Sequence, residues 1–310
     1  MRILFAGTPR AAVPSLEALH GSPHEVVAVL TRPDTRAGRG RGQHRSEVGL
    51  RADELGIPLL QPRSLREPEA VQQIAACGAE LAVIVAYGGL VPPEALAVPP
   101  HGWVNLHFSL LPRWRGAAPV QHAIAAGDEE IGACTFRLEE GLDTGPVYRE
   151  LSIPMPPRAT SGELLQTLAL DGAALLRSTV DDIAAGTAQA VPQPDEGVTL
   201  APKLSVADAQ VHFAQDAMVV DRMVRAATPA PGAWFTLGGV RLKLGPVEPL
   251  NENLPAGELV VTKHDVVIGC ATGAVRLGQV QPQGKRPMAA ADYARGARLS
   301  SGMLVDEASL

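Results

Sequence analysis

The sequence predicts an α/β domain built on a mostly parallel sheet, followed by a small β-barrel domain. Three observations support this fold class. Through the first 150 residues, short apolar runs alternate with segments of helical spacing. Near residue 187 the chain turns to Pro, small and polar residues without periodicity. Beyond it, five short strand-like segments follow within roughly 50 residues, as in small barrels.

The first domain begins with a strand and continues in a strand–helix rhythm. Short apolar runs, typical of strands buried on both faces, occur at residues 3–6, 26–30, 81–86 and 103–106. Helical spacing occurs at residues 13–20, 67–76, 119–126 and 162–185. This alternation is typical of a parallel sheet with helices on both sides, in which ligands bind beyond the carboxyl ends of the strands.

The second domain is set apart by composition. We expect a catalytic domain over residues 1–186, a linker over 187–205 and a C-terminal domain over 206–310. In the last of these, one helical pattern covers residues 208–227. Short strand patterns, separated by turn signals such as Gly238-Gly239, follow at residues 234–237, 240–244, 258–262, 266–270 and 274–281.

Composition excludes several classes of protein. The chain has 310 residues, 46% of them hydrophobic, which is typical of an ordered globular protein. No apolar run approaches the roughly 18–20 residues of a membrane span. The three cysteines are far apart and form no CxxC, so neither a disulfide framework nor a metal site is expected. We expect a monomeric protein of the reducing cytoplasm without a membrane partner.

Charge is unevenly distributed along the chain. The net charge is −6, yet residues 31–51 carry six arginines against two carboxylates, a local charge of +4. These arginines are Arg32, Arg36, Arg39, Arg41, Arg45 and Arg51. Arg-rich and Gly-rich loops are often simply solvated. A basic island on an acidic chain nevertheless favours one localised anionic partner.

Polar side chains with acyl-transfer chemistry gather at the end of the fourth predicted strand. Asn105 and His107 are two residues apart, so on a strand they project from one face. A carboxamide can donate to an oxyanion, and imidazole can move a proton near neutral pH. A carboxylate follows at Asp143. Each residue alone could be a core histidine or a loop cap, but three compatible groups at loop and strand ends favour an active site.

Longer motifs surround these residues. The segment 104–119 with Gly141-Leu-Asp-Thr-Gly145 resembles the folate-dependent formyltransferases. Further matching stretches lie in order along the chain, at residues 5–9, 32–40, 85–88, 203–205 and 225–234. The resemblance implies a Rossmann-like formyltransferase domain, a linker and a C-terminal OB-like barrel. It also implies formyl transfer from 10-formyltetrahydrofolate to the α-amino group of methionyl initiator tRNA, without a metal.

The resemblance implies a role for each matching residue. Asn105 would donate to the oxyanion, His107 would stabilise the same oxygen or relay a proton, and Asp143 would orient and charge-balance His107. The folate cosubstrate would be bound by the turn Ser109, Leu110, Leu111 and Pro112, with Tyr87 and Gly88 beside it. The tRNA would be bound by Arg36, Arg39 and Arg41. Residues 43–48 depart from the lysine-rich continuation usual in the family.

Three alternatives remain open at this stage. The acceptor could be a different amine, such as a nucleotide sugar or glycinamide ribonucleotide, although the basic loop and second domain favour tRNA. Water could replace the amine, which would make the protein a folate-dependent hydrolase. The chain could also be a non-catalytic tRNA-binding module, which the intact Asn/His/Asp set disfavours.

Overall fold

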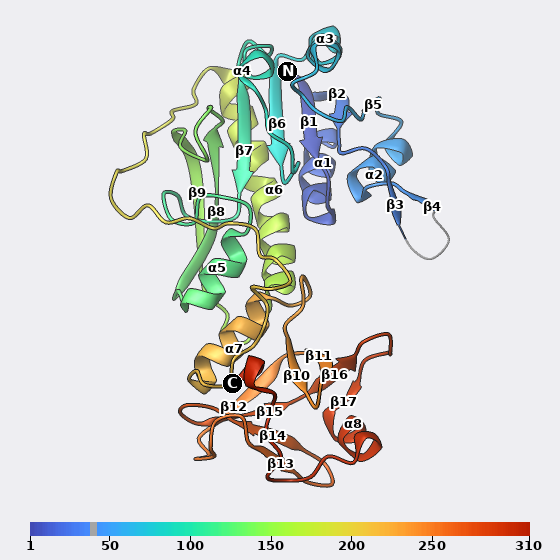
Figure 1. Cartoon of the computed structure of the whole chain (residues 1–310). Helices are drawn as coiled ribbons and strands as arrows, with labels where there is room; N and C mark the ends of the chain where they lie inside the picture. Colours follow the sequence, from blue (N-terminus) through green and yellow to red (C-terminus); the bar gives the residue numbers. More distant parts are fainter. Residues whose placement is uncertain (38–41) are drawn as a thin grey trace. The chain divides into compact units, whose positions relative to one another are not determined.

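A computed structural model describes residues 1–37 and 42–310, which form two compact units (Figure 1). The first unit contains Met1–Pro119, Glu130–Pro154 and Leu165–Ala201. The second contains Val120–Glu129, Met155–Leu164 and Pro202–Leu310. No helix within the described residues is long and apolar enough to cross a membrane.

A seven-stranded sheet forms the centre of the first unit, in the order β5-β2-β1-β6-β7-β8-β9. Five neighbouring strands run parallel, namely β5 (Leu59–Leu60), β2 (Glu25–Leu30), β1 (Arg2–Gly7), β6 (Leu81–Val85) and β7 (Trp103–His107). Two antiparallel strands complete it, β8 (Glu130–Arg137) and β9 (Val147–Pro154). The predicted mostly parallel sheet is therefore confirmed, while β5, β8 and β9 are additions that the sequence did not predict.

Helices cover this sheet. They are α1 (Val13–His20), α2 (Glu47–Leu55), α3 (Pro68–Ala76), α4 (Pro93–Leu96) and most of α6 (Ser161–Ala185), with a short 3-10 turn η1 (Arg10–Ala12). The prediction of helices at residues 13–20, 67–76 and 162–185 is confirmed to within one residue. Helix α2 was not predicted, although Ser46 caps its start by accepting from the Gly49 N–H at 3.0 Å.

Packing in the core of the first unit holds β6 and β7 in place. Trp103, at the start of β7, is buried, and its indole N–H donates to the Ala95 carbonyl of α4 at 3.0 Å. Every residue of β6 is buried, as expected of a strand with helices on both faces. Tyr87, just beyond β6, packs in the same hydrophobic cluster. The carboxyl ends of both strands are thereby held at one edge of the sheet.

The second unit contains two four-stranded antiparallel sheets, which make a barrel-like domain. One has the order β10-β11-β16-β17 and the other β12-β15-β14-β13. The strands are β10 (Trp234–Leu237), β11 (Val240–Leu244), β12 (Val247–Leu250), β13 (Leu259–Val261), β14 (Val266–Gly269), β15 (Ala274–Leu277), β16 (Gln279–Pro282) and β17 (Met288–Ala289). The helical elements are α5 (Pro119–Ala126, assigned to this unit from Val120 on), α7 (Ala217–Ala226), α8 (Ala290–Ala297) and η2 (Glu307–Ser309).

Two predictions in this unit are corrected. The helix expected over residues 208–227 begins only at Ala217, because Asp216 is its N-cap and accepts from the Met218 N–H at 2.7 Å. Residues 274–281 form two strands, β15 and β16, separated by Gly278. Strands β12 and β17 were not predicted.

The segment predicted as a linker forms no helix, but its residues 187–201 belong to the first unit. Val191 exchanges two backbone hydrogen bonds of 2.8 Å with Val147 at the start of β9. Further along, Leu200 forms a parallel bridge with Arg115. This part of the chain is therefore bonded to β9 and to the segment after β7 in the first unit.

Candidate active site

Strand β7 delivers Asn105 and His107 to the site. Its backbone is paired on both sides, with Asn105 opposite Ile84 of β6 and His107 opposite Cys134 of β8. Two ladders fix the strand, so both side chains start from well-determined positions. His107 is buried, whereas Asn105 is partly exposed. The Asn105 carboxamide makes no hydrogen bond to any residue that the structure describes, which leaves its N–H groups available to a ligand.

His107 is held in one tautomer. Its Nε2 lies 2.9 Å from the carbonyl oxygen of Trp114. A carbonyl can only accept a hydrogen bond, so Nε2 carries the proton and Nδ1 of the neutral ring is bare. Burial is the main cause that lowers the pKa of His107, opposed by the charge of Asp143 and by the Trp114 carbonyl. The ring is therefore neutral near neutral pH and presents Nδ1 as a proton acceptor.

Asp143 faces that nitrogen. Its Oδ2 lies 3.9 Å from His107 Nδ1, too far for a hydrogen bond but close enough for an ion pair once the imidazole is protonated. The same oxygen accepts from the Gly116 N–H at 2.7 Å. Asp143 itself adopts a positive φ of 51°. The structure thus brings His107 and Asp143 together, with Asn105 on the same strand face as His107.

Two glycines allow the loops to approach this closely. Gly116 has a φ of 127°, and a Cβ there would stand 2.6 Å from the carbonyl oxygen of Ala201. A Cβ on Gly145 would stand 1.7 Å from the carbonyl oxygen of Arg137. A larger residue at Gly116 would push the loop after β7 away from Ala201, and one at Gly145 would push the loop that carries Asp143 away from Arg137.

Trp114 is a contributor that sequence reasoning missed. It has a φ of 63°, which is rare for a bulky residue and turns its carbonyl toward His107. Its backbone N–H donates to Thr199 Oγ1 at 2.8 Å. The Arg113 guanidinium lies over its ring, 4.6 Å from the centroid. No local residue pattern encodes such a backbone conformation, so only the three-dimensional structure reveals this role.

The predicted folate-binding residues divide into buried and accessible members. Ser109 is buried, and its hydroxyl donates to the Arg113 carbonyl at 2.7 Å. Leu111 packs with Cys134 and Phe136, and Tyr87 lies in the core. The remaining members, which expose surface, are Leu110, Pro112 and Gly88. The buried members shape the turn, while the accessible ones could contact a ligand.

A basic cavity next to Tyr87 was not predicted. It has a volume of about 160 Å³ and is lined by Arg32, Arg63 and Arg66 together with Tyr87 and Leu90. Arg32 donates to the Arg63 carbonyl at 3.1 Å, which ties two of the arginine segments together. Arg32 is far from Arg63 and Arg66 in sequence, so spacing gave no signal. Three guanidinium groups around one cavity could hold an anionic group.

The predicted tRNA-binding arginines are placed only in part. Arg36 lies on β3 (Thr35–Ala37), which pairs with β4 (Gly42–His44), while Arg39 and Arg41 lie outside the described residues. Within the same basic island, Arg45 pairs with Asp34 and Asp53. Arg51 bonds Glu17 and Glu54 at 2.8 and 2.7 Å. Part of the island's positive charge is thus balanced by neighbouring carboxylates.

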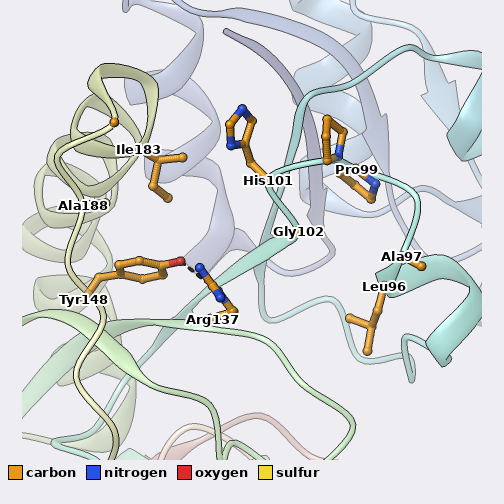
Figure 2. A pocket seen from close by; sticks show the side chains of 11 residues that line it. Leu96, Ala97, Pro99, His101, Gly102, Arg137, Tyr148, Ile183 and Ala188 are labelled. Atoms are coloured by element: carbon orange, nitrogen blue, oxygen red, sulfur yellow. Dashed lines mark hydrogen bonds between the residues drawn. The ribbon is translucent and has the colours of Figure 1, made fainter.

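A second, larger cavity holds none of the predicted site residues. It measures about 560 Å³ and lies before the start of β7, with His101, Arg137, Tyr148 and Ile183 on its walls (Figure 2). Arg137 Nε donates to the Tyr148 hydroxyl at 3.2 Å. Asn105, His107 and Asp143 lie at the other end of the strand, so the acyl-transfer geometry is not found in this cavity.

Cys134 is a potential nucleophile beside His107. It is fully buried opposite His107 in the sheet, and burial raises the pKa of its thiol to about 12. Such a thiol stays protonated and unreactive near neutral pH. Among residues 1–37 and 42–310, no group of three or more His, Cys, Asp or Glu side chains could hold a metal ion.

Comparisons with known proteins identify the family of this chain. The formyl transferase family model matches residues 1–180, and the model of the formyl transferase C-terminal domain matches residues 203–298. Methionyl-tRNA formyltransferase of Salinispora arenicola is 56% identical over 304 residues, covering 97% of this chain and 99% of that protein. The Thermobifida fusca protein of the same name is also 56% identical, covering 97% and 98%.

The fold is also found among solved structures. HypX from Aquifex aeolicus in complex with tetrahydrofolic acid superposes with a TM-score of 0.64 at 18% identity. The match covers 95% of this chain and 47% of HypX. At this identity the likeness concerns the fold.

Proposed function

Since this chain belongs to the formyl transferase family, we propose that the end of β7 is its formyl-transfer site. The enzyme transfers a formyl group from 10-formyltetrahydrofolate to the α-amino group of methionyl initiator tRNA, giving N-formylmethionyl-tRNA for translation initiation. One observation carries the site assignment. A neutral His107 presents Nδ1 to the Asp143 carboxylate, and on the same strand face the Asn105 carboxamide has no hydrogen-bond partner among the described residues.

The reaction requires one net proton transfer. The amine nitrogen forms a bond to the formyl carbon, and the bond from that carbon to the folate nitrogen breaks. One proton moves from the attacking amine to the leaving nitrogen. The protein must therefore stabilise the oxyanion and carry that proton.

Asn105 supplies the first of these functions in our proposal. Its carboxamide N–H donates to the oxyanion that develops when the amine attacks. The partly exposed side chain on a doubly paired strand supports this role, because it is positioned before substrate arrives.

His107 supplies the second function. With Nε2–H engaged by the Trp114 carbonyl, a neutral ring has no proton on Nδ1 to donate to an oxygen. This favours the proton-relay role over the oxyanion role. His107 Nδ1 accepts the amine proton and returns it to the leaving nitrogen. Asp143, 3.9 Å away, stabilises the imidazolium formed in between.

No covalent enzyme intermediate is needed. The neighbouring thiol, Cys134, is buried and has a raised pKa, so it does not act as a nucleophile. Direct attack by the amine on the bound formyl donor is the simplest course consistent with these residues.

Folate binding is assigned to the turn after β7 and to the loop after β6. Leu110, Pro112 and Gly88 offer accessible surface for the flat ring system, and 10-formyltetrahydrofolate supplies the formyl group when it is bound. The cavity lined by Arg32, Arg63 and Arg66 suits the carboxylates of the folate glutamate tail.

Binding of tRNA is assigned to Arg36, Arg39 and Arg41, because residues 31–51 carry +4 on a chain of net charge −6. Arg39→Ala should raise the KM for tRNA. It should also make the KM for tRNA less dependent on salt, by the amount expected for the loss of about one phosphate contact. Unchanged KM and salt dependence would remove this assignment. We also propose that the protein is a monomer in the cytoplasm. Its three cysteines are free and form no disulfide, which supports a reducing compartment.

The function is tested by acceptor-dependent release of tetrahydrofolate from 10-formyltetrahydrofolate. We expect release with methionyl initiator tRNA, but not with uncharged tRNA, glycinamide ribonucleotide or an amino sugar nucleotide. Release without any acceptor would indicate a hydrolase. Release only with another amine would change the acceptor, and no release at all would indicate a binding module.

A further inference from the structure

The segment after α6 makes specific contacts with both loops of the active site. The Thr199 carbonyl accepts from the Arg115 N–H at 2.9 Å, and the Ala201 N–H donates to the Arg115 carbonyl at 2.7 Å. The Ala118 N–H in turn donates to the Ala201 carbonyl at 3.0 Å. The loop that follows the catalytic strand is thus held by residues about 80 positions further along the chain.

Gln193 connects this segment to the loop that carries Asp143. Its side-chain NH₂ group donates to two backbone carbonyls, those of Asp143 and Gly145, each at 2.8 Å. Its carbonyl oxygen accepts from Arg115 Nε at 3.1 Å and Nη2 at 2.7 Å. A carboxamide has two donors and two acceptor lone pairs, so all four are used.

The side-chain amide of Gln193 can be oriented in only one chemically consistent way. Exchanging the amide nitrogen and oxygen would place N–H groups against the Arg115 guanidinium and lone pairs against two carbonyls. The network therefore needs a glutamine, because glutamate would lose both donors and methionine would lose all four interactions. Arg115, Gln193 and the loop over residues 143–145 form one connected unit.

Asp143 needs such external support. Its φ of 51° is unfavourable for a residue with a Cβ. Gln193 holds the Asp143 carbonyl and the Gly145 carbonyl, on either side of Thr144. The Gly116 N–H holds the carboxylate. Backbone and side chain of Asp143 are therefore fixed by two groups from outside its own loop.

We propose that Gln193 is a positioning residue for formyl transfer, which keeps the Asp143 carboxylate directed at His107 Nδ1. This inference rests on the proposed function. Gln193 acts through Asp143, since its side-chain hydrogen bonds go to Arg115, Asp143 and Gly145. The predicted linker is thus part of the catalytic apparatus as well as the connection to the second domain.

The test replaces Gln193 with methionine, which keeps the length of the side chain and removes its hydrogen bonds. Gln193→Met should lower kcat by between about 10- and 100-fold, since small misplacements of a reacting group are costly, while both KM values stay near wild type. Gln189→Met is the matched control. Gln189 is exposed in the same segment, makes no hydrogen bond to the described residues, and should leave kcat unchanged when replaced.

The pH profile distinguishes positioning from general stabilisation. The charge of Asp143 raises the pKa of His107, so a displaced carboxylate lowers that pKa and moves the acid limb of kcat to lower pH. A purely structural role for Gln193 would lower the unfolding temperature without moving this limb. Should Gln193→Met fail to fold, Gln193→Glu carries the same test, because it keeps the contact with Arg115.

A double-mutant cycle gives the decisive comparison. In an Asp143→Ala background, Gln193→Met should reduce kcat no further, because the group that Gln193 positions is absent. Full additivity of the two losses, or a folded Gln193→Met enzyme with wild-type kcat and pH profile, would overturn the inference. If the wild-type protein and Gln189→Met both fail to formylate methionyl-tRNA, the proposed function has failed instead.

Discussion

The end of β7 and the loop over residues 141–145 contribute to the same proposed active site by opposite structural means. Asn105 and His107 stand on a strand that is paired on both sides, so the sheet determines their positions. Asp143 stands on a loop at a positive φ and is held by the Gly116 N–H and by Gln193. The strand residues depend on the fold as a whole, whereas the loop residue depends on a few named hydrogen bonds.

Because of this difference, substitutions in the two regions should impair the site in different ways. A substitution on β7 removes a chemical group but leaves the sheet intact. A substitution around the loop keeps every side chain of the proposed site but changes where Asp143 lies. The two regions should therefore respond differently in chemistry, in pH dependence and in stability.

The largest effect is expected on the strand. Asn105→Ala removes the proposed oxyanion donor and should lower kcat by about 10²- to 10³-fold, with little change in unfolding temperature. Single-turnover formylation with saturating folate and tRNA measures this directly. Near-wild-type turnover would remove Asn105 from the mechanism.

A smaller effect with a diagnostic pH dependence is expected for the loop. Asp143→Asn keeps an oxygen for the Gly116 N–H but removes the charge, and should lower kcat by up to about 10²-fold. The carboxylate raises the pKa of His107, so its loss should move the acid limb of kcat to lower pH. The amine of the substrate ionises identically in both enzymes, so the difference between the two profiles reports on His107. An unmoved limb would mean that Asp143 does not act on His107.

The smallest effect on the chemistry, with a clear effect on stability, is expected at Gly116. Gly116→Ala places a Cβ 2.6 Å from the Ala201 carbonyl at a φ of 127°, and should lower the free energy of unfolding by about 1–3 kcal/mol. Urea denaturation measures this, with Ala117→Ser on the exposed neighbour as control. Equal stability of both variants would show that the loop tolerates displacement there.

Sequence reasoning succeeded where regular structure carries the information. The strand period of two placed Asn105 and His107 on one face, and apolar runs located four of the five parallel strands. It failed for β9, an edge strand whose side chains are largely exposed and therefore form no apolar run. It also failed at the start of α7, where the capping side chain of Asp216 outweighs the continuing helical pattern.

The residues that hold His107 and Asp143 in place could not be predicted from the sequence, for a physical reason. Trp114 acts through its carbonyl at a positive φ, and Gly116 acts through its N–H and its missing Cβ. Gln193 lies in a segment of Pro, small and polar residues that is typical of a linker. Backbone groups and long-range hydrogen bonds leave no periodic trace in a sequence, so only the structure shows what holds Asp143 in place.

The central claim is that His107 is neutral and presents a bare Nδ1 to Asp143. Nitrogen-15 NMR of histidine-labelled protein observes this directly, with His107→Gln identifying the resonances. Near neutral pH we expect His107 to carry its proton on Nε2, with Nδ1 unprotonated. A proton on Nδ1, whether in the other tautomer or in an imidazolium, would contradict the account.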